Sequence, residues 1–198
     1  MDASAWDDRY RTSELVWTGE PNIFLVEVAA KLGPGRALDV ACGEGRNAVW
    51  LASQGWRVSA ADFSARGLEK AQALATGRGV ELELIEADVV RWQPQPRSFD
   101  LVAVLYLQLE AAERDLALAA AASAVAPGGS LLVVAHDSTN LEEGYGGPGS
   151  ASVLYSAADV VAALPELAIR AAGRRERVVS TDDGERIALD AVAWLARP

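Results

Sequence analysis

Short strand-like runs alternate with longer helix-like runs along most of this 198-residue chain. Because two parallel strands need a long crossover connection, which is usually a helix, this alternation is typical of a parallel sheet covered by helices. Strands are predicted over residues 37–40, 56–61, 80–86, 99–105, 130–135, 167–180 and 186–196. Helices are predicted over residues 21–32, 47–54, 64–75, 110–125 and 156–164. The sequence therefore predicts an α/β fold.

Two segments depart from this alternation. The last two predicted strands are joined by the short turn 181–184, which ends in Gly184, so we expect an antiparallel hairpin there. Residues 136–150 contain four glycines and one proline and are predicted to form a loop. Such a loop is either a plain connection or a contact with a bound molecule.

The composition predicts one domain with one hydrophobic core. Of all residues, 51% are hydrophobic and 23% are charged, and no Pro- or Ser-rich linker divides the chain. We predict a single domain over residues 1–198, with residues 1–35 as an N-terminal helical cap and residues 36–198 as the core. Three aromatic residues of the cap, Trp6, Tyr10 and Trp17, either pack on the sheet or belong to a lid over a site.

Charge and cysteine content exclude several classes of protein. The net charge is −10, so a nucleic-acid backbone or an anionic membrane surface would be repelled. A single cysteine, Cys42, and a single histidine, His136, cannot form a zinc site or a disulfide framework. The N-terminus has no apolar signal segment, and the longest apolar run, 116–126, is well short of the roughly 20 residues of a membrane span. We expect a cytoplasmic protein.

The most informative segment is the turn between the first predicted strand and the helix that follows it, residues 39–47. Gly43 and Gly45 allow the backbone to turn tightly and to approach a ligand, and the start of the helix offers free N–H groups. With Ala48 these glycines also match the dinucleotide pattern Gly-x-Gly-x-x-Ala. The glycines predict a ligand site without deciding which ligand it takes.

Three carboxylates near this turn narrow the choice. Asp39, four positions before Gly43, would repel a pyrophosphate and attract a cationic amino-acid group. Asp62 ends the second strand, where it can accept hydrogen bonds from both hydroxyls of a ribose. Asp88 ends the third strand, where it can accept from the adenine amine while Val89 contacts the ring. Together they predict a pocket for a methionine-linked adenosine.

In these motifs the chain resembles the class I S-adenosylmethionine-dependent methyltransferases, and among them the small bacterial enzymes related to the tellurite-resistance and thiopurine methyltransferases. The matching segments, in family order, are 38–45, Asp62, 87–88, 98–100 and 126–129. The resemblance implies a Rossmann-like seven-stranded sheet of order 3-2-1-4-5-7-6, in which only strand seven is antiparallel. It also implies S-adenosylmethionine as cofactor and S-adenosylhomocysteine as product.

The resemblance further implies which residues hold the cofactor. Asp39 and the glycine turn would hold its methionine end, Asp62 its ribose and Asp88 its adenine. The full set that we expect to bind the cofactor is Asp39, Ala41, Gly43, Gly45, Asn47, Asp62, Phe63, Asp88 and Val89.

In this family the methyl group moves by in-line SN2 displacement, for which positioning and desolvation suffice without a nucleophilic side chain or a metal. Residues that contact the acceptor should follow strands four and five: Tyr106 and Gln108 after the former, His136 and Asp137 after the latter. We expect His136 and Tyr106 to be the catalytic residues, with His136 able to remove a proton.

The acceptor is predicted to be a small molecule, with a thiol, a heterocycle and a metalloid oxyanion as open alternatives. The segment 106–109 (Tyr-Leu-Gln-Leu) replaces the Asn-Pro-Pro-Tyr type of sequence found in enzymes that methylate amino groups of nucleic acids or glutamine. Two other functions stay open: a catalytically idle protein that binds S-adenosylmethionine or S-adenosylhomocysteine, and a nicotinamide-dependent oxidoreductase. The oligomeric state is not predicted.

Overall fold

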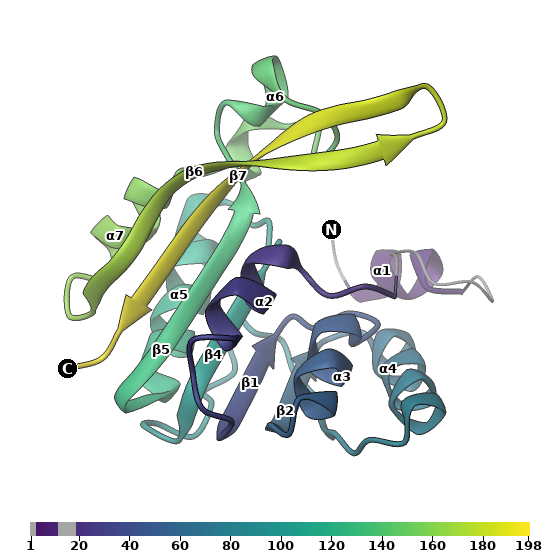
Figure 1. Ribbon diagram of the computed structural model, residues 1–198, viewed down its shortest axis with the longest axis vertical. Helices are drawn as coiled ribbons and strands as arrows, with labels where there is room; N and C mark the ends of the chain where they lie inside the picture. The colour runs from purple at the N-terminus through teal and green to yellow at the C-terminus, as the bar shows by residue number, and fades with distance from the viewer. Residues whose placement is uncertain (1–2, 12–18) are drawn as a thin grey trace.

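The computed structural model describes residues 3–11 and 19–198 and contains one seven-stranded sheet of order β3-β2-β1-β4-β5-β7-β6 (Figure 1). Strand β7 is antiparallel to both of its neighbours, and the other recorded strand pairs are parallel. The strands are β1 Arg36–Val40, β2 Arg57–Asp62, β3 Glu83–Glu86, β4 Phe99–Leu105, β5 Val125–His136, β6 Ala168–Thr181 and β7 Gly184–Ala196. The predicted α/β class and strand order are confirmed.

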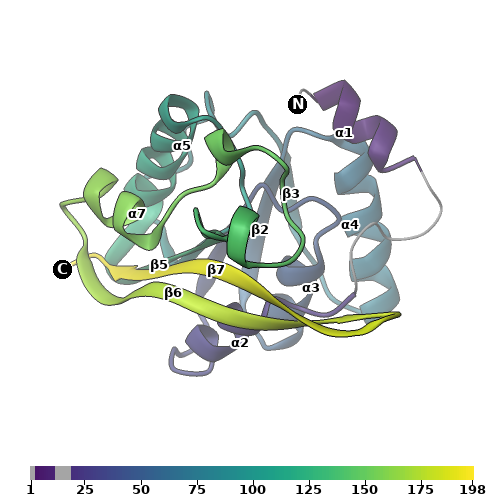
Figure 2. The ribbon, with the colours of Figure 1, turned by 90° about the horizontal axis from the view of Figure 1, so that it is seen from above.

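Helices cover both faces of the sheet (Figures 1 and 2). They are α1 Ala3–Arg9, α2 Ile23–Ala29, α3 Arg46–Ser53, α4 Ala65–Arg78, α5 Ala111–Ala124, α6 Asn140–Glu143 and α7 Ala157–Ala163, with a 3-10 turn at Ala151–Val153. One buried layer joins α5 and α7 to one face, and a second joins α2, α3 and α4 to the other. On β1, Ala37 contributes to the second layer and Leu38 to the first, because successive side chains of a strand point to opposite faces.

The ends of several elements differ from the prediction. Helix α4 continues through Gly77 to Arg78 and ends at Gly79, whose left-handed conformation (φ +65°) closes the helix. The N–H of Val80 donates to Ala75 O at this helix end, and strand pairing begins only at Glu83, opposite Ser59. The predicted strand 80–86 is therefore shortened to 83–86.

Two further boundaries differ near the C-terminal half. Strand β5 starts at Val125, which pairs with Phe99, and the register then shifts before Ser130 pairs with Leu101. Residues 127–129, between the predicted helix 110–125 and the predicted strand 130–135, thus lie inside an irregular strand. The predicted loop 136–150 contains the single helical turn α6.

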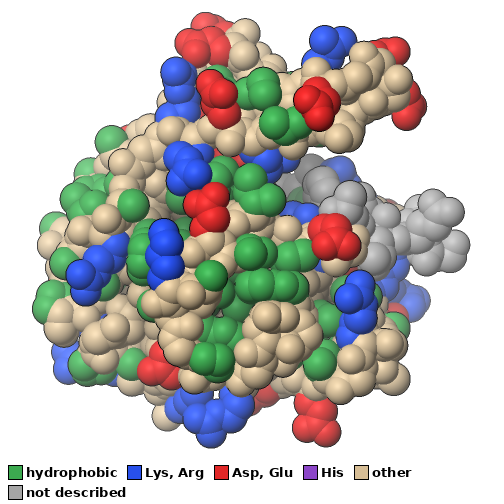
Figure 3. Space-filling view, viewed as in Figure 1, with side chains coloured by type: hydrophobic (Ala, Val, Ile, Leu, Met, Phe, Trp, Pro, Cys, Tyr) green, Lys and Arg blue, Asp and Glu red, His purple; other side chains and the backbone are tan. Residues whose placement is uncertain are grey.

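The predicted C-terminal hairpin is present and extends beyond the sheet. Strand β5 pairs with β7 from Ala196 to Asp190, whereas residues 184–189 of β7 pair with β6. This outer part of the hairpin projects past the carboxyl end of β5 (Figure 1) and stands clear of the body of the molecule in the space-filling view (Figure 3). Its underside therefore borders the edge of the sheet where the parallel strands end.

Among the residues described, no helix combines the length and apolar character needed to cross a membrane.

Candidate functional site

The glycine turn joins β1 to α3 at the carboxyl edge of the sheet. Gly45 precedes α3 with φ +78°, and a Cβ atom there would lie 2.5 Å from Ala71 Cβ of α4. Only glycine fits both this backbone conformation and this close approach of α4. Ala41 also has a positive φ of 58°, which is uncommon for a residue with a side chain. The turn is thus held in one tight conformation by its neighbours.

Asp39 lies at the centre of this region and is 1% exposed. Its carboxylate accepts a hydrogen bond from the Ala48 N–H in the first turn of α3, while its Oδ2 atom has no hydrogen-bond partner among the described residues. Burial, reinforced by the charge of Asp62, raises the pKa of Asp39 to about 7, and the positive charge of Arg46 partly opposes this. A buried carboxylate oxygen without a partner is a ready acceptor for a cationic ligand group.

Asp62 lies at the end of β2 and is also buried. Its Oδ2 accepts from the Gly43 N–H at 2.8 Å and its Oδ1 from the Ser64 N–H at 2.9 Å. The Phe63 N–H also donates to it. Burial raises the pKa of Asp62, and these backbone donors oppose the rise. Asp62 therefore ties the glycine turn to the start of α4, where Ser64 is the N-cap residue.

The remaining predicted cofactor residues lie at the same edge but differ in burial. Asp88 follows β3, as predicted, but its side chain is 50% exposed and its Oδ2 lies 3.7 Å from Arg91 Nε. Val89 is buried in the core layer of α5. Asn47, in the first turn of α3, is buried and accepts from the Asn22 N–H through Oδ1 at 2.8 Å. The three carboxylates thus lie at the ends of three adjacent strands, with Asp88 the most open to solvent.

Helix α1 and Tyr10 lie against the glycine turn. A Cβ atom built on Gly43 would lie 2.8 Å from Tyr10 Oη, and Tyr10 is buried. Asp7 of α1 accepts a hydrogen bond from the Ser64 hydroxyl at the start of α4. Trp17, the third aromatic residue named for the cap, falls outside the described residues. The sequence analysis named Tyr10 among the aromatic residues of the cap. No sequence pattern pointed to Asp7.

A second group of polar side chains gathers where β4, β5 and β7 meet the projecting hairpin. We call it the Asp190 cluster: Asp190, Arg177, Tyr106 and His136. Asp190 is 0% exposed, and its Oδ2 accepts from Tyr106 Oη at 2.9 Å and from Arg177 Nε at 2.6 Å. Sequence reasoning missed Asp190 and Arg177, although Asp190 is the only charged residue between Arg186 and Arg197 in an otherwise apolar strand.

His136 lies at the end of β5, opposite Asp190 of β7, and its side chain is 14% exposed. Its Nδ1 lies 3.6 Å from Asp190 Oδ1 and makes no hydrogen bond to the described residues. The Tyr106 ring lies beside it with centroids 4.9 Å apart, and a Cβ at Gly147 would lie 2.8 Å from its Cγ. Burial lowers the pKa of His136, and so does the charge of Arg177, while the charge of Asp190 raises it.

Tyr106 connects the two groups. It follows β4 with φ +59°, a strained conformation for a tyrosine, which often marks a functional position. Its Oη accepts from Asn22 Nδ2 at 3.3 Å, and Asn22 in turn donates its N–H to Asn47. Asn22 is a buried residue that the sequence analysis did not name; as the N-cap of α2 it also accepts from the Phe24 and Leu25 N–H groups. Asn22 therefore links the Asp190 cluster to the glycine turn: its side chain donates to Tyr106, and its backbone N–H donates to Asn47.

The other two acceptor candidates have different surroundings. Gln108 Nε2 is buried and has no hydrogen-bond partner among the described residues. Asp137 is buried and accepts from the N–H and the hydroxyl of Thr139 at 3.0 and 2.9 Å, so it stabilises the turn that leads into α6.

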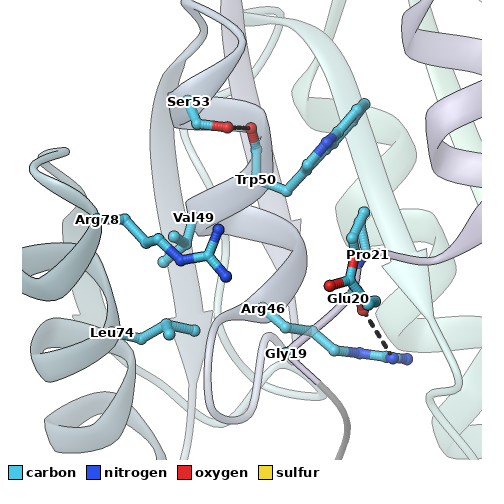
Figure 4. A pocket seen from close by; sticks show the side chains of 9 residues that line it. All are labelled: Gly19, Glu20, Pro21, Arg46, Val49, Trp50, Ser53, Leu74 and Arg78. Carbon is cyan, nitrogen blue, oxygen red and sulfur yellow. Dashed lines mark hydrogen bonds between the residues drawn. The ribbon is translucent and has the colours of Figure 1, made fainter.

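A small hollow of about 50 Å³ lies on the outer side of α3, between α4 and the residues that precede α2 (Figure 4). Its lining includes Arg46, Trp50 and Arg78, and Arg46 Nη1 donates to Glu20 O at 3.1 Å. Its lining includes neither Asp39 nor Asp62, and it includes no member of the Asp190 cluster. It is separate from the candidate site.

Known proteins that resemble this chain indicate a family for the site described above. Residues 37–129 match the family described as "Methyltransferase domain". The chain is 33% identical over 111 residues to the demethylmenaquinone methyltransferase of Thermus thermophilus, covering 55% of this chain and 50% of the relative. It is 32% identical over 98 residues to the ubiquinone biosynthesis O-methyltransferase of Idiomarina loihiensis, covering 48% and 40%. The match thus spans half or less of the length of these curated relatives.

Among solved structures, the N-methyltransferase NodS of Bradyrhizobium japonicum WM9, in complex with S-adenosylhomocysteine, superposes with a TM-score of 0.74 at 18% identity. The superposition covers 99% of this chain and 98% of that chain, which confirms the fold over nearly the whole length. The finer resemblance to tellurite-resistance and thiopurine enzymes stays a prediction. Residues 37–129 thus match a methyltransferase domain, and the chain as a whole has the fold of class I S-adenosylmethionine-dependent methyltransferases.

Proposed function

We propose that this protein transfers the methyl group of S-adenosylmethionine to a small-molecule acceptor. The observation that carries the proposal is Asp39: its buried Oδ2 has no hydrogen-bond partner in the described part of the chain, and it lies beside a tight glycine turn. The methyltransferase-domain match over residues 37–129 supports the cofactor, and the names of the two curated relatives support a small-molecule acceptor.

The residues present fit this cofactor. Asp39 would accept from the amino group of the methionine moiety, and this contact would favour its ionised form. Asp62 keeps lone pairs beyond its backbone contacts for ribose hydroxyls, and Asp88 and Val89 would contact the adenine. We further propose that Ala41, Gly43, Gly45, Asn47 and Phe63 line the path of the ligand.

The same charges disfavour the nicotinamide alternative. Asp39 and Asp62 both flank the glycine turn, where the pyrophosphate of a dinucleotide would lie. Two buried carboxylates there would repel it, whereas the cofactor that we propose carries no phosphate.

When bound, S-adenosylmethionine supplies an electrophilic methyl group on a sulfonium, and transfer to an acceptor X–H gives X–CH₃, S-adenosylhomocysteine and a proton. The side chains that would meet the acceptor are Tyr106 and His136, at the ends of β4 and β5. Tyr106 would orient the acceptor through its ring, and His136 would take the proton.

The proposed cap over this site is formed by the segment that contains α1 and α2. The cytoplasmic location stays a prediction.

Calorimetric titration tests the cofactor. We expect S-adenosylhomocysteine to bind with micromolar affinity and NAD to give no heat. Asp39→Asn should weaken binding, while Asp100→Asn is a matched control, because Asp100 lies at the opposite end of β4 and accepts from the Arg36 N–H. Binding of NAD alone, or equal affinity in both variants, would refute the proposed site.

Turnover separates an enzyme from an idle binding protein. Purified protein with S-adenosylmethionine carrying a labelled methyl group is incubated with a panel of thiols, phenols, heterocyclic amines and tellurite. Label transfer to one member identifies the acceptor class. Binding of the cofactor with no transfer to any class would favour the idle alternative.

A further inference from the structure

The two oxygens of the Asp190 carboxylate contact different sets of side-chain atoms. Its Oδ2 accepts from Tyr106 Oη and Arg177 Nε, while its Oδ1 lies 3.4 Å from Arg177 Nη2 and 3.6 Å from His136 Nδ1. Because Tyr106 and Arg177 come from the chain after β4 and from β6, the carboxylate is held from two sides. Its Oδ1 edge is therefore presented to the imidazole in a fixed position.

This arrangement bears on which nitrogen of His136 carries the hydrogen. A neutral imidazole has one N–H and one lone pair, and the choice is set by the group that faces each nitrogen. A lone pair on Nδ1 would face the negative Oδ1 of Asp190 across 3.6 Å and would be repelled. A hydrogen on Nδ1 is attracted instead. The separation of Nδ1 and Oδ1 is longer than a hydrogen bond, so the interaction between them is electrostatic.

We propose that Asp190 is a positioning residue that keeps neutral His136 in the tautomer with hydrogen on Nδ1, so that Nε2 is the base for an acceptor that carries a removable proton. This inference rests on the proposed methyl transfer and specifies its acceptor as a hydroxyl, thiol or N–H compound. The acceptor X–H bond breaks, its proton moves to Nε2, and the electron pair stays on X for the new bond to carbon. Asp190 then faces the imidazolium, whose proton later passes to solvent.

The charged and titratable groups that face His136 support this division of roles. Arg177 from β6 and Asp190 from β7 carry opposite charges, and Tyr106 follows β4. Burial and Arg177 together keep the pKa of His136 below its ordinary value, so the imidazole is neutral and its lone pair is free at neutral pH. A metalloid centre that attacks through its own lone pair has no such proton to lose, so this site favours the X–H classes.

The single histidine makes the tautomer directly measurable. Protein labelled with ¹⁵N and carrying no histidine tag gives one imidazole in a long-range ¹H–¹⁵N correlation spectrum. At pH 8 we expect Nδ1 to show the shift of a protonated nitrogen and Nε2 that of an unprotonated one. A spectrum with hydrogen on Nε2 in the unaltered protein would overturn the proposal, and this measurement depends on no variant.

Titration of the same signals in variants tests the two charges separately. Asp190→Asn should lower the pKa of His136 by about 1–3 units, because an opposite charge close by is removed. Arg177→Gln should raise it, because a like charge is removed. Glu176→Gln is the matched control: Glu176 is an exposed neighbour of Arg177 on the same strand, and its side chain lies on the opposite face of the hairpin, so the pKa should stay unchanged.

Two results would refute the role of Asp190: an unchanged pKa in a folded Asp190→Asn protein, or shifts of the same sign in the Asp190 and Arg177 variants. Should Asp190→Asn fail to fold, the tautomer of the unaltered protein and the Arg177→Gln shift decide. Calorimetry with S-adenosylhomocysteine on the same samples tests the proposed function independently. Normal binding with the wrong tautomer would refute only this inference. Absent binding with the expected tautomer would refute the function, and with it the role of Nε2 as base, but not the effect of Asp190 on the tautomer.

Discussion

The glycine turn and the Asp190 cluster both centre on buried carboxylates, but they are assembled in different ways. Asp39 and Asp62 accept from backbone N–H groups of nearby segments, and the longest of these contacts, Gly43 to Asp62, spans 19 positions. Asp190 accepts from side chains, and its bond with Tyr106 spans 84 positions. The first region is built by consecutive strand–turn–helix units. In the second, the Arg177–Asp190 contact spans 13 positions within one hairpin, but Tyr106 and His136 join it only when β4, β5 and β7 come together.

The two regions also differ in charge balance. Arg177 binds the carboxylate of Asp190 directly, whereas one oxygen of Asp39 has no hydrogen-bond partner within residues 3–11 and 19–198. Leaving a buried acceptor unsatisfied costs free energy, so a fold retains it where a ligand uses it. The comparison indicates that the glycine turn is prepared for a cationic ligand, whereas the carboxylate of Asp190 already has its partners within the protein.

The largest effect should come from closing the space behind the glycine turn. Gly45→Ala adds a Cβ atom 2.5 Å from Ala71 Cβ at a positive φ, so we expect a loss of about 2–5 kcal/mol in the free energy of unfolding. Gly79→Ala has a similar φ of +65° with open space around the new atom, and should lose only about 1–2 kcal/mol. Urea denaturation measures both. Equal losses would show that backbone conformation alone, and not contact with α4, requires glycine at Gly45.

The next effect is on cofactor affinity. Asp62→Asn removes a charged acceptor from the Gly43 and Ser64 N–H groups, and should weaken S-adenosylhomocysteine binding about 10- to 100-fold. Asp88→Asn alters a half-exposed carboxylate and should cost at most about fivefold. Calorimetry at one pH compares the two. A larger loss at Asp88 would mean that the cofactor depends more on the open end of the site than on the turn.

A smaller effect should appear in the pH dependence of stability. The pKa of Asp39 is about 7 in the folded protein and about 3.8 in the unfolded chain, so the folded state binds more protons between these values. The contribution of Asp39 to stability is therefore greatest below pH 4 and falls as the pH rises to about 7. Asp39→Asn removes this dependence and should stabilise the protein at pH 8 by about 1–2 kcal/mol, since the unpartnered amide offsets part of the gain.

Unfolding curves at pH 5 and pH 8 test this prediction for the unaltered protein and for Asp39→Asn. The difference between the two proteins should be larger at pH 8. A difference that is the same at both pH values would show that Asp39 does not titrate in this range.

The smallest effect should come from the cluster. Tyr106→Phe keeps the ring beside His136 and removes the hydroxyl that donates to Asp190 and accepts from Asn22. We expect a loss of about 1 kcal/mol in thermal or urea unfolding. S-adenosylhomocysteine affinity should not change. A loss as large as that of Gly45→Ala would mean that the cluster, rather than the glycine turn, holds this edge of the sheet together.

Much of the fold and one half of the site were predictable from the sequence. The strands, the order of the motifs and the positions of Asp39, Asp62 and Asp88 follow from local patterns: apolar runs, glycine turns and carboxylates at strand ends. Element ends were less predictable where a neighbour decides them. Gly77 does not end α4, although glycine is a weak helix former; the left-handed Gly79 does, and the Val80 N–H is then used at the end of that helix before β3 begins.

The sequence by itself determined the α/β architecture, the glycine turn and the carboxylates beside it, because each of these depends on residues close together in the chain. Only the tertiary structure decided that Asp190 and Arg177 meet Tyr106 and His136, and that Asn22 joins them to Asn47. The physical reason is that these contacts join residues from separate strands and helices. The register of the strands and the packing of the helices, which no local pattern encodes, bring them together.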